Sequence, residues 1–221
     1  MPRSIAIVGG TGAEGFGLAT RLARAGARVI IGSRDLAKAQ AAAARIPGAE
    51  GRLNPDAASE AEIVILTVPL AAQIAILKSI RGSFRPGAIL VDATVPLEAA
   101  IGGRASRALT LWSGSAAQQA AQHVPDGVAV VAAFHTLSAE VLAQIDHPID
   151  SDILICGDNA DAKTAVREVI ALLPGARAVD AGPLENARLI ETLAALLISL
   201  NIRHKVKGSG VRITGLGNRG G

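Results

Sequence analysis

A run of glycines near the start of the chain has the composition and spacing of a dinucleotide-binding loop. Gly10, Gly12 and Gly15 form the pattern G-x-G-x-x-G between an apolar run and a helical pattern. The first glycine permits a tight turn, the second lets the backbone approach a pyrophosphate, and the third lets the helix pack on the strand. The N-terminus of that helix offers free N–H groups and a favourable dipole to phosphate oxygens. We therefore predict that this loop binds a dinucleotide.

The residues after the next apolar run indicate which dinucleotide is bound. Enzymes that use NAD usually carry Asp or Glu about 20 residues after the glycines, where the carboxylate binds the ribose 2′-hydroxyl. Here that position falls at Gly32 and Ser33, and Arg34 follows. Ser33 and Arg34 offer a hydroxyl and a guanidinium to a 2′-phosphate, and Lys38 adds a second cation one helical turn later. We predict NADP(H), with Asp35 as the N-cap of the helix rather than a ribose ligand.

Few side chains in the chain could donate the proton that carbonyl or imine reduction normally needs. Tyr is absent, which excludes the short-chain dehydrogenases because they depend on a catalytic Tyr. Among the four His residues, His135 follows an apolar run at the sheet edge where α/β proteins bind ligands. A histidine that simply ends a strand is an equally good interpretation. We assign no residue a catalytic role and expect no metal site. If the hydride acceptor is a second flat cofactor, hydride passes directly between the two rings, and the protein only has to hold the rings in position.

Composition and charge limit the remaining classes. Cys156 is the only cysteine, so no intramolecular disulfide can form and nothing indicates secretion. The longest apolar stretch, residues 63–80, contains Pro69 and Lys78 and is better explained as a strand, a turn and a helix than as a membrane span. We expect a cytoplasmic protein with no membrane partner. Five Lys and Arg residues and no acid follow position 202, but no aromatic side chain accompanies them, so nucleic-acid binding is not expected.

Strand and helix patterns alternate along the chain, which is typical of an α/β fold. We expect a Rossmann-type, doubly wound parallel sheet in residues 1–135, which bind NADP, and a smaller C-terminal α/β domain in residues 136–221. Strands are predicted at residues 4–8, 28–31, 63–68, 88–95, 128–134, 152–156 and 176–180. Helices are predicted at residues 13–25, 35–46, 71–81, 116–123, 138–145, 160–173 and 185–201.

Nearly the whole chain carries short motifs that occur together in one family. The motifs are Val8-Gly9-Gly10-Thr11-Gly12, Gly32-Ser33-Arg34 with Lys38, Leu66-Thr67-Val68-Pro69, Val95-Pro96, His135-Thr136, Cys156-Gly157-Asp158, and Asp180-Ala181-Gly182-Pro183-Leu184 followed by Asn186, Arg188 and Leu189. In these motifs the chain resembles the NADPH-dependent reductases of the 5-deazaflavin coenzyme F420, the F420H2:NADP oxidoreductases. The Asp-Ala-Gly-Pro-Leu block and the His-Thr pair, in this order, are more specific than the glycines.

The resemblance implies an oxidoreductase that transfers a hydride between NADP(H) and coenzyme F420, an 8-hydroxy-5-deazaflavin, directly from ring to ring. It also implies a homodimer. Two alternatives stay open at this point. One is an NADPH-dependent reductase of another flavin or of an imine. The other is a non-catalytic NADP-binding sensor, which a glycine loop with few acid–base residues also permits.

The resemblance further implies roles for individual residues. The segment Thr11-Gly12-Ala13-Glu14 is expected to wrap the pyrophosphate, while Leu70 and Val95 flank the nicotinamide with Ala139 nearby. The remaining positions belong to the deazaflavin: Pro96, His135 and Leu137 line its cleft, Leu137 packs where the two rings meet, and the turn Gly208-Ser209-Gly210 closes over it. The basic tail is a candidate for attracting the phosphate and polyglutamate chain of F420, and a solvated basic end explains it equally well.

Overall fold

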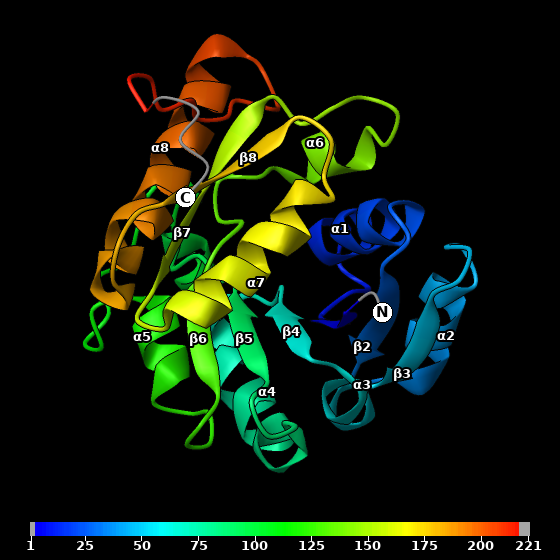
Figure 1. Cartoon of the computed structure of the whole chain (residues 1–221). Helices are drawn as coiled ribbons and strands as arrows, with labels where there is room; N and C mark the ends of the chain where they lie inside the picture. The colour runs from blue at the N-terminus through cyan, green and yellow to red at the C-terminus, as the bar shows by residue number, and fades with distance from the viewer. Residues whose placement is uncertain (1–2, 217–221) are drawn as a thin grey trace.

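Eight segments of residues 3–216, the part of the chain that the computed structural model describes, form strands of one sheet (Figure 1). Their order across the sheet is β3-β2-β1-β4-β5-β6-β7-β8. The neighbours from β3 to β6 pair in parallel, β7 pairs with β6 in the antiparallel sense, and β8 is parallel to β7. The strands are β1 (Ser4–Val8), β2 (Arg28–Ser33), β3 (Glu50–Leu53), β4 (Ile63–Leu66), β5 (Ile89–Asp92), β6 (Ala129–Ala132), β7 (Ser151–Gly157) and β8 (Ala176–Asp180).

Helices cover both faces of this sheet. Side chains alternate between the two faces of a strand, so Ile5 and Ile7 of β1 lie in one apolar cluster and Ala6 and Val8 in the other. Helices α1, α2, α6 and α7 complete the first cluster, and α3, α4, α5 and α8 complete the second. The helices are α1 (Ala13–Arg24), α2 (Leu36–Ala43), α3 (Asn54–Glu60), α4 (Leu70–Ile80), α5 (Ala116–Ala121), α6 (Ala139–Ala143), α7 (Ala160–Ala171) and α8 (Ala187–His204).

Short polar side chains fix where several helices begin. Asp35, Ser138 and Asn159 each accept a hydrogen bond from a backbone N–H in the first turn of α2, α6 and α7, at 3.2, 3.2 and 2.8 Å. These bonds satisfy N–H groups that have no partner within the helix. The predicted N-cap role of Asp35 is confirmed.

The expected Rossmann-type α/β sheet is confirmed, with differences at the strand ends. The strands predicted at residues 63–68 and 88–95 end earlier, at Leu66 and Asp92. Pairing stops there because the chain turns out of the sheet at its carboxyl edge. The residues that follow each strand are therefore loops, and these loops form part of the cleft described below.

β3 and α3 were not expected from the sequence. β3 lies at the edge of the sheet and carries Glu50 and Arg52 in place of an apolar run. Gly51 is required there, because a Cβ atom at this position would lie 2.5 Å from the backbone carbonyl carbon of Ala39 in α2. Polar composition concealed the strand, while close packing of α2 against its backbone selects a glycine.

The predicted domain boundary after His135 falls between β6 and α6. The sheet continues past that point, because Val131 and Ala132 of β6 pair with Gly157 and Cys156 of β7. The strand direction reverses at the same place. A division into two domains stays a prediction.

The apolar stretch over residues 63–80 forms β4, a turn and α4, as expected. Pro69 occupies the N-cap position of α4. Nowhere in residues 3–216 is there a helix with both the length and the apolar character that a membrane span needs.

Candidate active site

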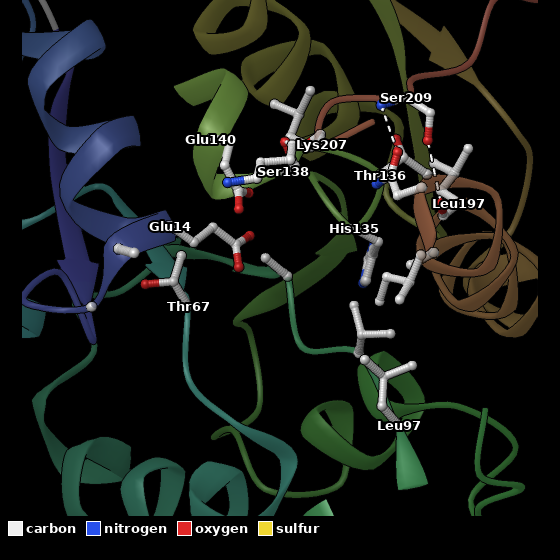
Figure 2. Close-up of a pocket in the computed structure, with 18 of the residues that line it drawn as sticks. Glu14, Thr67, Leu97, His135, Thr136, Ser138, Glu140, Leu197, Lys207 and Ser209 are labelled. Carbon is white, nitrogen blue, oxygen red and sulfur yellow. Dashed lines mark hydrogen bonds between the residues drawn. The ribbon is translucent and has the colours of Figure 1, made fainter. Parts of the chain in front are cut away.

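The carboxyl ends of β1, β4, β5 and β6 border a cleft of about 690 Å³ (Figure 2). In the sheet order, β1 has β2 on one side and β4 on the other, which is the reversal of strand order where open α/β sheets bind their ligands. Glu14 of α1 and Glu140 of α6 lie on one side of the cleft in Figure 2, and Leu197 of α8 and Ser209 lie on the other. His135 lies between them. The cleft therefore separates the glycine loop from α8 and the segment that follows it.

The glycine loop turns tightly between β1 and α1. Gly9 has a φ of +87°, and the N–H of Gly12 donates to the carbonyl oxygen of Gly9 at 2.9 Å. A Cβ atom at Gly15 would lie 2.4 Å from the hydroxyl oxygen of Thr67 and 2.9 Å from the Cα atom of Gly10. The first N–H groups of α1 have no acceptor within the helix and point toward this loop. The loop can therefore bind a pyrophosphate, and the missing side chains at Gly10 and Gly15 let the loop pack closely against its neighbours.

A smaller pocket of about 270 Å³ continues from the cleft toward the end of β2. Its lining includes Ser33, Arg34 and Lys38, and it shares Gly12 and residues 67–69 with the larger cleft. Arg34 and Lys38 are exposed and have no ion-pair partner among residues 3–216. Two unpaired cations beside a hydroxyl form a site for a phosphate monoester.

Asn54 belongs to this smaller pocket and was missed in the sequence. Its side chain is 3% exposed, and its Oδ1 atom has no hydrogen-bond partner in the described part of the chain. A buried amide oxygen without a partner is costly, so this atom is an unusual feature of the pocket. Asn54 begins α3, and the failure to predict α3 concealed it.

His135 reaches the cleft through an unusual turn. Phe134 has a φ of +72°, the left-handed region that favours glycine, and its side chain is buried. His135 is 6% exposed, and neither ring nitrogen has a partner among residues 3–216. Burial lowers the pKa of its imidazole to about 3. His135 is therefore neutral at physiological pH, with one N–H to donate and one nitrogen to accept.

Burial raises the pKa values of two carboxyl groups, those of Asp92 and Glu14. Burial raises the pKa of Asp92 to about 7, although hydrogen bonds from Gln73 at 2.7 Å and the N–H of Thr94 at 3.0 Å oppose the increase. Burial, and then the nearby charge of Asp92, raise the pKa of Glu14 to about 8. A protonated Glu14 places no negative charge beside a pyrophosphate and can donate a hydrogen bond into the cleft.

The far wall of the cleft comes from α8 and the segment after it. The backbone N–H of Ser209 donates to the Oδ1 atom of Asn201 at 3.1 Å, and its hydroxyl donates to the carbonyl oxygen of Leu197 at 3.3 Å (Figure 2). The hydroxyl of Ser138 donates to the carbonyl oxygen of Lys207 at 3.1 Å. These bonds hold residues 207–209 against both α8 and α6. The role of α8 in the cleft was missed because its apolar side chains have the pattern of an ordinary core helix.

The structure brings most of the predicted site residues together. Those that line the cleft are Gly12, Ala13, Glu14, Val95, His135, Leu137 and Ser209. Those that line the smaller pocket are Thr11, Gly12, Ser33, Arg34 and Lys38. The remaining ones lie outside both linings and next to lining residues or within the loop: Gly10, Gly15, Leu70, Pro96 and Ala139.

The basic tail does not act as one cluster. Arg212 forms ion pairs with Asp150 and Asp152, the latter at 3.1 Å, so the expectation that all five cations attract one ligand is wrong for this residue. Lys207 is exposed and lines the cleft. Arg219 lies outside the described residues.

Comparison with known proteins gives a consistent result. Residues 4–96 match the family described as NADP oxidoreductase, coenzyme F420-dependent. The chain is 47% identical over 225 residues to the F420-dependent NADP reductase of Methanothermobacter thermautotrophicus, covering 98% of this chain and 97% of that protein. It is 42% identical over 222 residues to the reductase of the same description from Methanocaldococcus jannaschii, covering 96% and 98%.

Solved structures agree. A putative F420-dependent NADP reductase from Arthrobacter sp. FB24 superposes with a TM-score of 0.84 at 26% identity, covering 96% of this chain and 99% of that one. A reductive aminase from Aspergillus terreus gives a TM-score of 0.61 at 17% identity, covering 93% of this chain and 63% of that one, which shows a shared fold alone. The geometry and the full-length relatives lead to one conclusion: this chain belongs to the family of F420-dependent NADP reductases.

Proposed function

We propose that this protein transfers a hydride between NADP(H) and coenzyme F420. One observation carries the proposal: a pocket with two cations that have no ion-pair partner among residues 3–216 shares lining residues with a larger cleft, which has room for a second ring system. The relatives that match the whole chain are described as F420-dependent NADP reductases. Together they favour this reaction over reduction of another flavin or an imine, and over a sensor without activity.

The proposed NADP(H) site begins at the smaller pocket. Arg34, Lys38 and the hydroxyl of Ser33 hold the 2′-phosphate, and Thr11-Gly12-Ala13-Glu14 surrounds the pyrophosphate. The unpartnered Oδ1 atom of Asn54 accepts a hydrogen bond from the adenosine. Val95 then marks the nicotinamide end, with Leu70 and Ala139 beside it.

The proposed deazaflavin site is the wall formed by His135 and Leu137, with Pro96 behind it and Ser209 closing over it. The unpartnered ring nitrogens of His135 suit a ligand that carries both hydrogen-bond donors and acceptors along its edge. Leu137 is 7% exposed and presents an apolar surface where two flat rings meet.

In this mechanism the protein holds the two cofactors in position and keeps water away from them. The two bound cofactors supply the hydride donor and acceptor carbons. The apolar walls exclude water, which would otherwise compete for the edges of the rings, and the anchored segments hold the rings at reacting distance. His135 stays neutral throughout, because burial depresses its pKa to about 3, so it orients a ligand rather than protonating one.

The quaternary structure and the tail complete the proposal. We propose a homodimer, for which α8 offers the exposed apolar side chains Leu189 and Leu196. Lys207 and the neighbouring Lys205 are proposed to attract the acidic chain of F420. Sedimentation analysis tests the first point, and a monomer at micromolar concentration would contradict it.

The test of the reaction mixes the protein with NADPH and oxidised F420 and follows the deazaflavin absorbance, then repeats this with FMN. We expect turnover with F420 and none with FMN, and much slower turnover when NADH replaces NADPH. Turnover of FMN alone would favour the general flavin reductase. Tight NADPH binding with no turnover of either would favour the sensor.

A further inference from the structure

Arg21 occupies an unusual position for a charged side chain. It lies in the third turn of α1 and is 4% exposed. Its guanidinium donates to four backbone carbonyl oxygens, those of Leu142 at 2.9 Å, His147 at 3.1 Å, Val141 at 2.8 Å and Gln144 at 2.6 Å. All four belong to the end of α6 and the turn that follows it. A single buried side chain thus connects α1 to α6.

The short length of α6 explains why this contact is needed. α6 has five residues, so most of its carbonyl groups have no partner within the helix. The fork of an arginine can satisfy several of them at once, and its positive charge is favourable at a helix C-terminus. Lysine has one donor centre and cannot span the same set. Arg21 therefore maintains both the shape of α6 and its place against α1.

α1 and α6 are also in direct contact. They lie side by side in Figure 1, and a Cβ atom at Gly17 would lie 2.7 Å from the Cβ atom of Leu142. The absence of a side chain at Gly17 lets the two helices approach. Arg21, one turn later on α1, then holds them together.

The other end of α6 contacts the deazaflavin side of the cleft. Ser138, its N-cap, donates to the carbonyl oxygen of Lys207, and a Cβ atom at Gly208 would lie 2.7 Å from a methyl group of Val141. α6 therefore lies between the helix that begins at the phosphate loop and the segment 207–209 that lines the opposite wall. Its position sets the distance between the two walls.

We propose that Arg21 is a positioning residue for hydride transfer, because it holds α6 at the separation from α1 that brings the two cofactor sites to reacting distance. The inference rests on the proposed function. A displacement of about 1 Å can cost roughly 100-fold in rate when two reactants must be aligned. Loss of Arg21 should therefore affect the transfer step far more than the binding of either cofactor.

The test compares Arg21→Met, Arg21→Lys and a control, Arg24→Met. Arg24 lies on the same helix and pairs with Asp146 at 3.0 Å, but its side chain is 55% exposed. NADPH affinity is measured by fluorescence titration, and hydride transfer by single-turnover stopped flow with deuterated and ordinary NADPH. We expect Arg21→Met to slow transfer by about 10- to 100-fold, to change NADPH affinity by less than about threefold, and to alter the isotope effect. Arg21→Lys should recover part of the rate, and Arg24→Met should behave as the unmodified protein.

Gly17→Ala provides an independent displacement of α6 in case Arg21→Met does not fold, and it should slow transfer in the same selective way. An unchanged transfer rate in Arg21→Met would overturn the proposal, as would a parallel loss of NADPH affinity and rate in all three site variants. Absence of F420 turnover by the unmodified protein would instead contradict the proposed function itself.

Discussion

The two ends of the cleft are built in different ways. The phosphate-binding end comes from one βαβ unit, in which the glycine loop and Arg34 are separated by little more than α1 and β2. The end proposed to bind the deazaflavin comes from the loops after β5 and β6, from α8, and from the segment after α8. The phosphate-binding end therefore depends on contacts between residues close in sequence. The other end depends on hydrogen bonds and ion pairs that join segments far apart in the chain. Substitutions at the two ends should therefore have different effects.

Arg34→Ala should have the largest effect of these substitutions, and it should weaken NADPH binding without changing the binding of F420. Loss of a charge-assisted contact to the 2′-phosphate removes about 2–3 kcal/mol, which weakens NADPH binding by roughly 30- to 150-fold. NADH has no such phosphate, so its affinity should hardly change. Titration with both nucleotides measures this, and Lys78→Ala, in the last turn of α4, is the control. An equal loss for NADH and NADPH would contradict the assignment.

Asp152→Asn should weaken the second end and leave the first intact. Asp152 is fully buried, and its carboxylate accepts hydrogen bonds from Arg177 at 2.6 and 2.9 Å and from the N–H of Ile213 at 2.7 Å. These bonds, with that from Arg212, anchor the chain just after the segment that lines the cleft. We expect a loss of about 2 kcal/mol in the free energy of unfolding and a higher KM for F420, with NADPH affinity unchanged. A fall in NADPH affinity of the same size would show that the two ends are not independent.

The same carboxylate predicts a pH dependence of stability. Its contacts with Arg177, Ile213 and Arg212 lower the pKa of Asp152 to about 2, below the value of about 3.9 in an unfolded chain. The stabilisation is therefore fully present above pH 4 and is lost as the pH falls toward 2. Chemical unfolding measured from pH 6 down to pH 2 should show this loss of stability in the unmodified protein. In Asp152→Asn, the part of the loss that comes from protonation of Asp152 should be absent.

Glu14→Gln tests how the charge of Glu14 affects NADPH binding at the phosphate-binding end. Because the pKa of Glu14 is raised to about 8, ionisation above that pH places a negative charge beside the pyrophosphate. Repulsion of roughly 1 kcal/mol should weaken NADPH binding by about fivefold between pH 7 and pH 9. The Gln variant cannot ionise, so the corresponding change should disappear. A steep loss in both proteins would assign the effect to another group.

Neutralising Lys205 and Lys207 should have the smallest effect. Both side chains are exposed, and screened surface charges are worth less than about 1 kcal/mol. We expect the KM for F420 to rise by about threefold at low ionic strength and to return to the normal value in high salt. Deletion of residues 217–221 should leave the kinetics unchanged. An unaltered KM for F420 in the double variant would contradict the proposed role of these lysines.

The contrast between the two ends also explains what could be predicted. The strand at residues 4–8, the helix that follows it and the N-cap role of Asp35 depend on neighbours close in sequence, and each was predicted correctly. Asn54 was missed because it begins α3, a short helix that was not predicted and that follows the polar edge strand β3. The function of Arg21 could not be predicted, because its partners follow it by more than 100 residues.

The sequence by itself determined the Rossmann unit, the preference for a 2′-phosphate and the family. These properties follow from residue types at short, regular spacings, where chain geometry leaves few alternatives. Only the tertiary structure decided which side chains of α8 face the cleft, that Arg212 anchors the chain instead of facing a ligand, and that α6 separates the two walls. Such contacts join segments far apart in the chain, so their geometry exists only once the sheet has formed and the helices have packed on it.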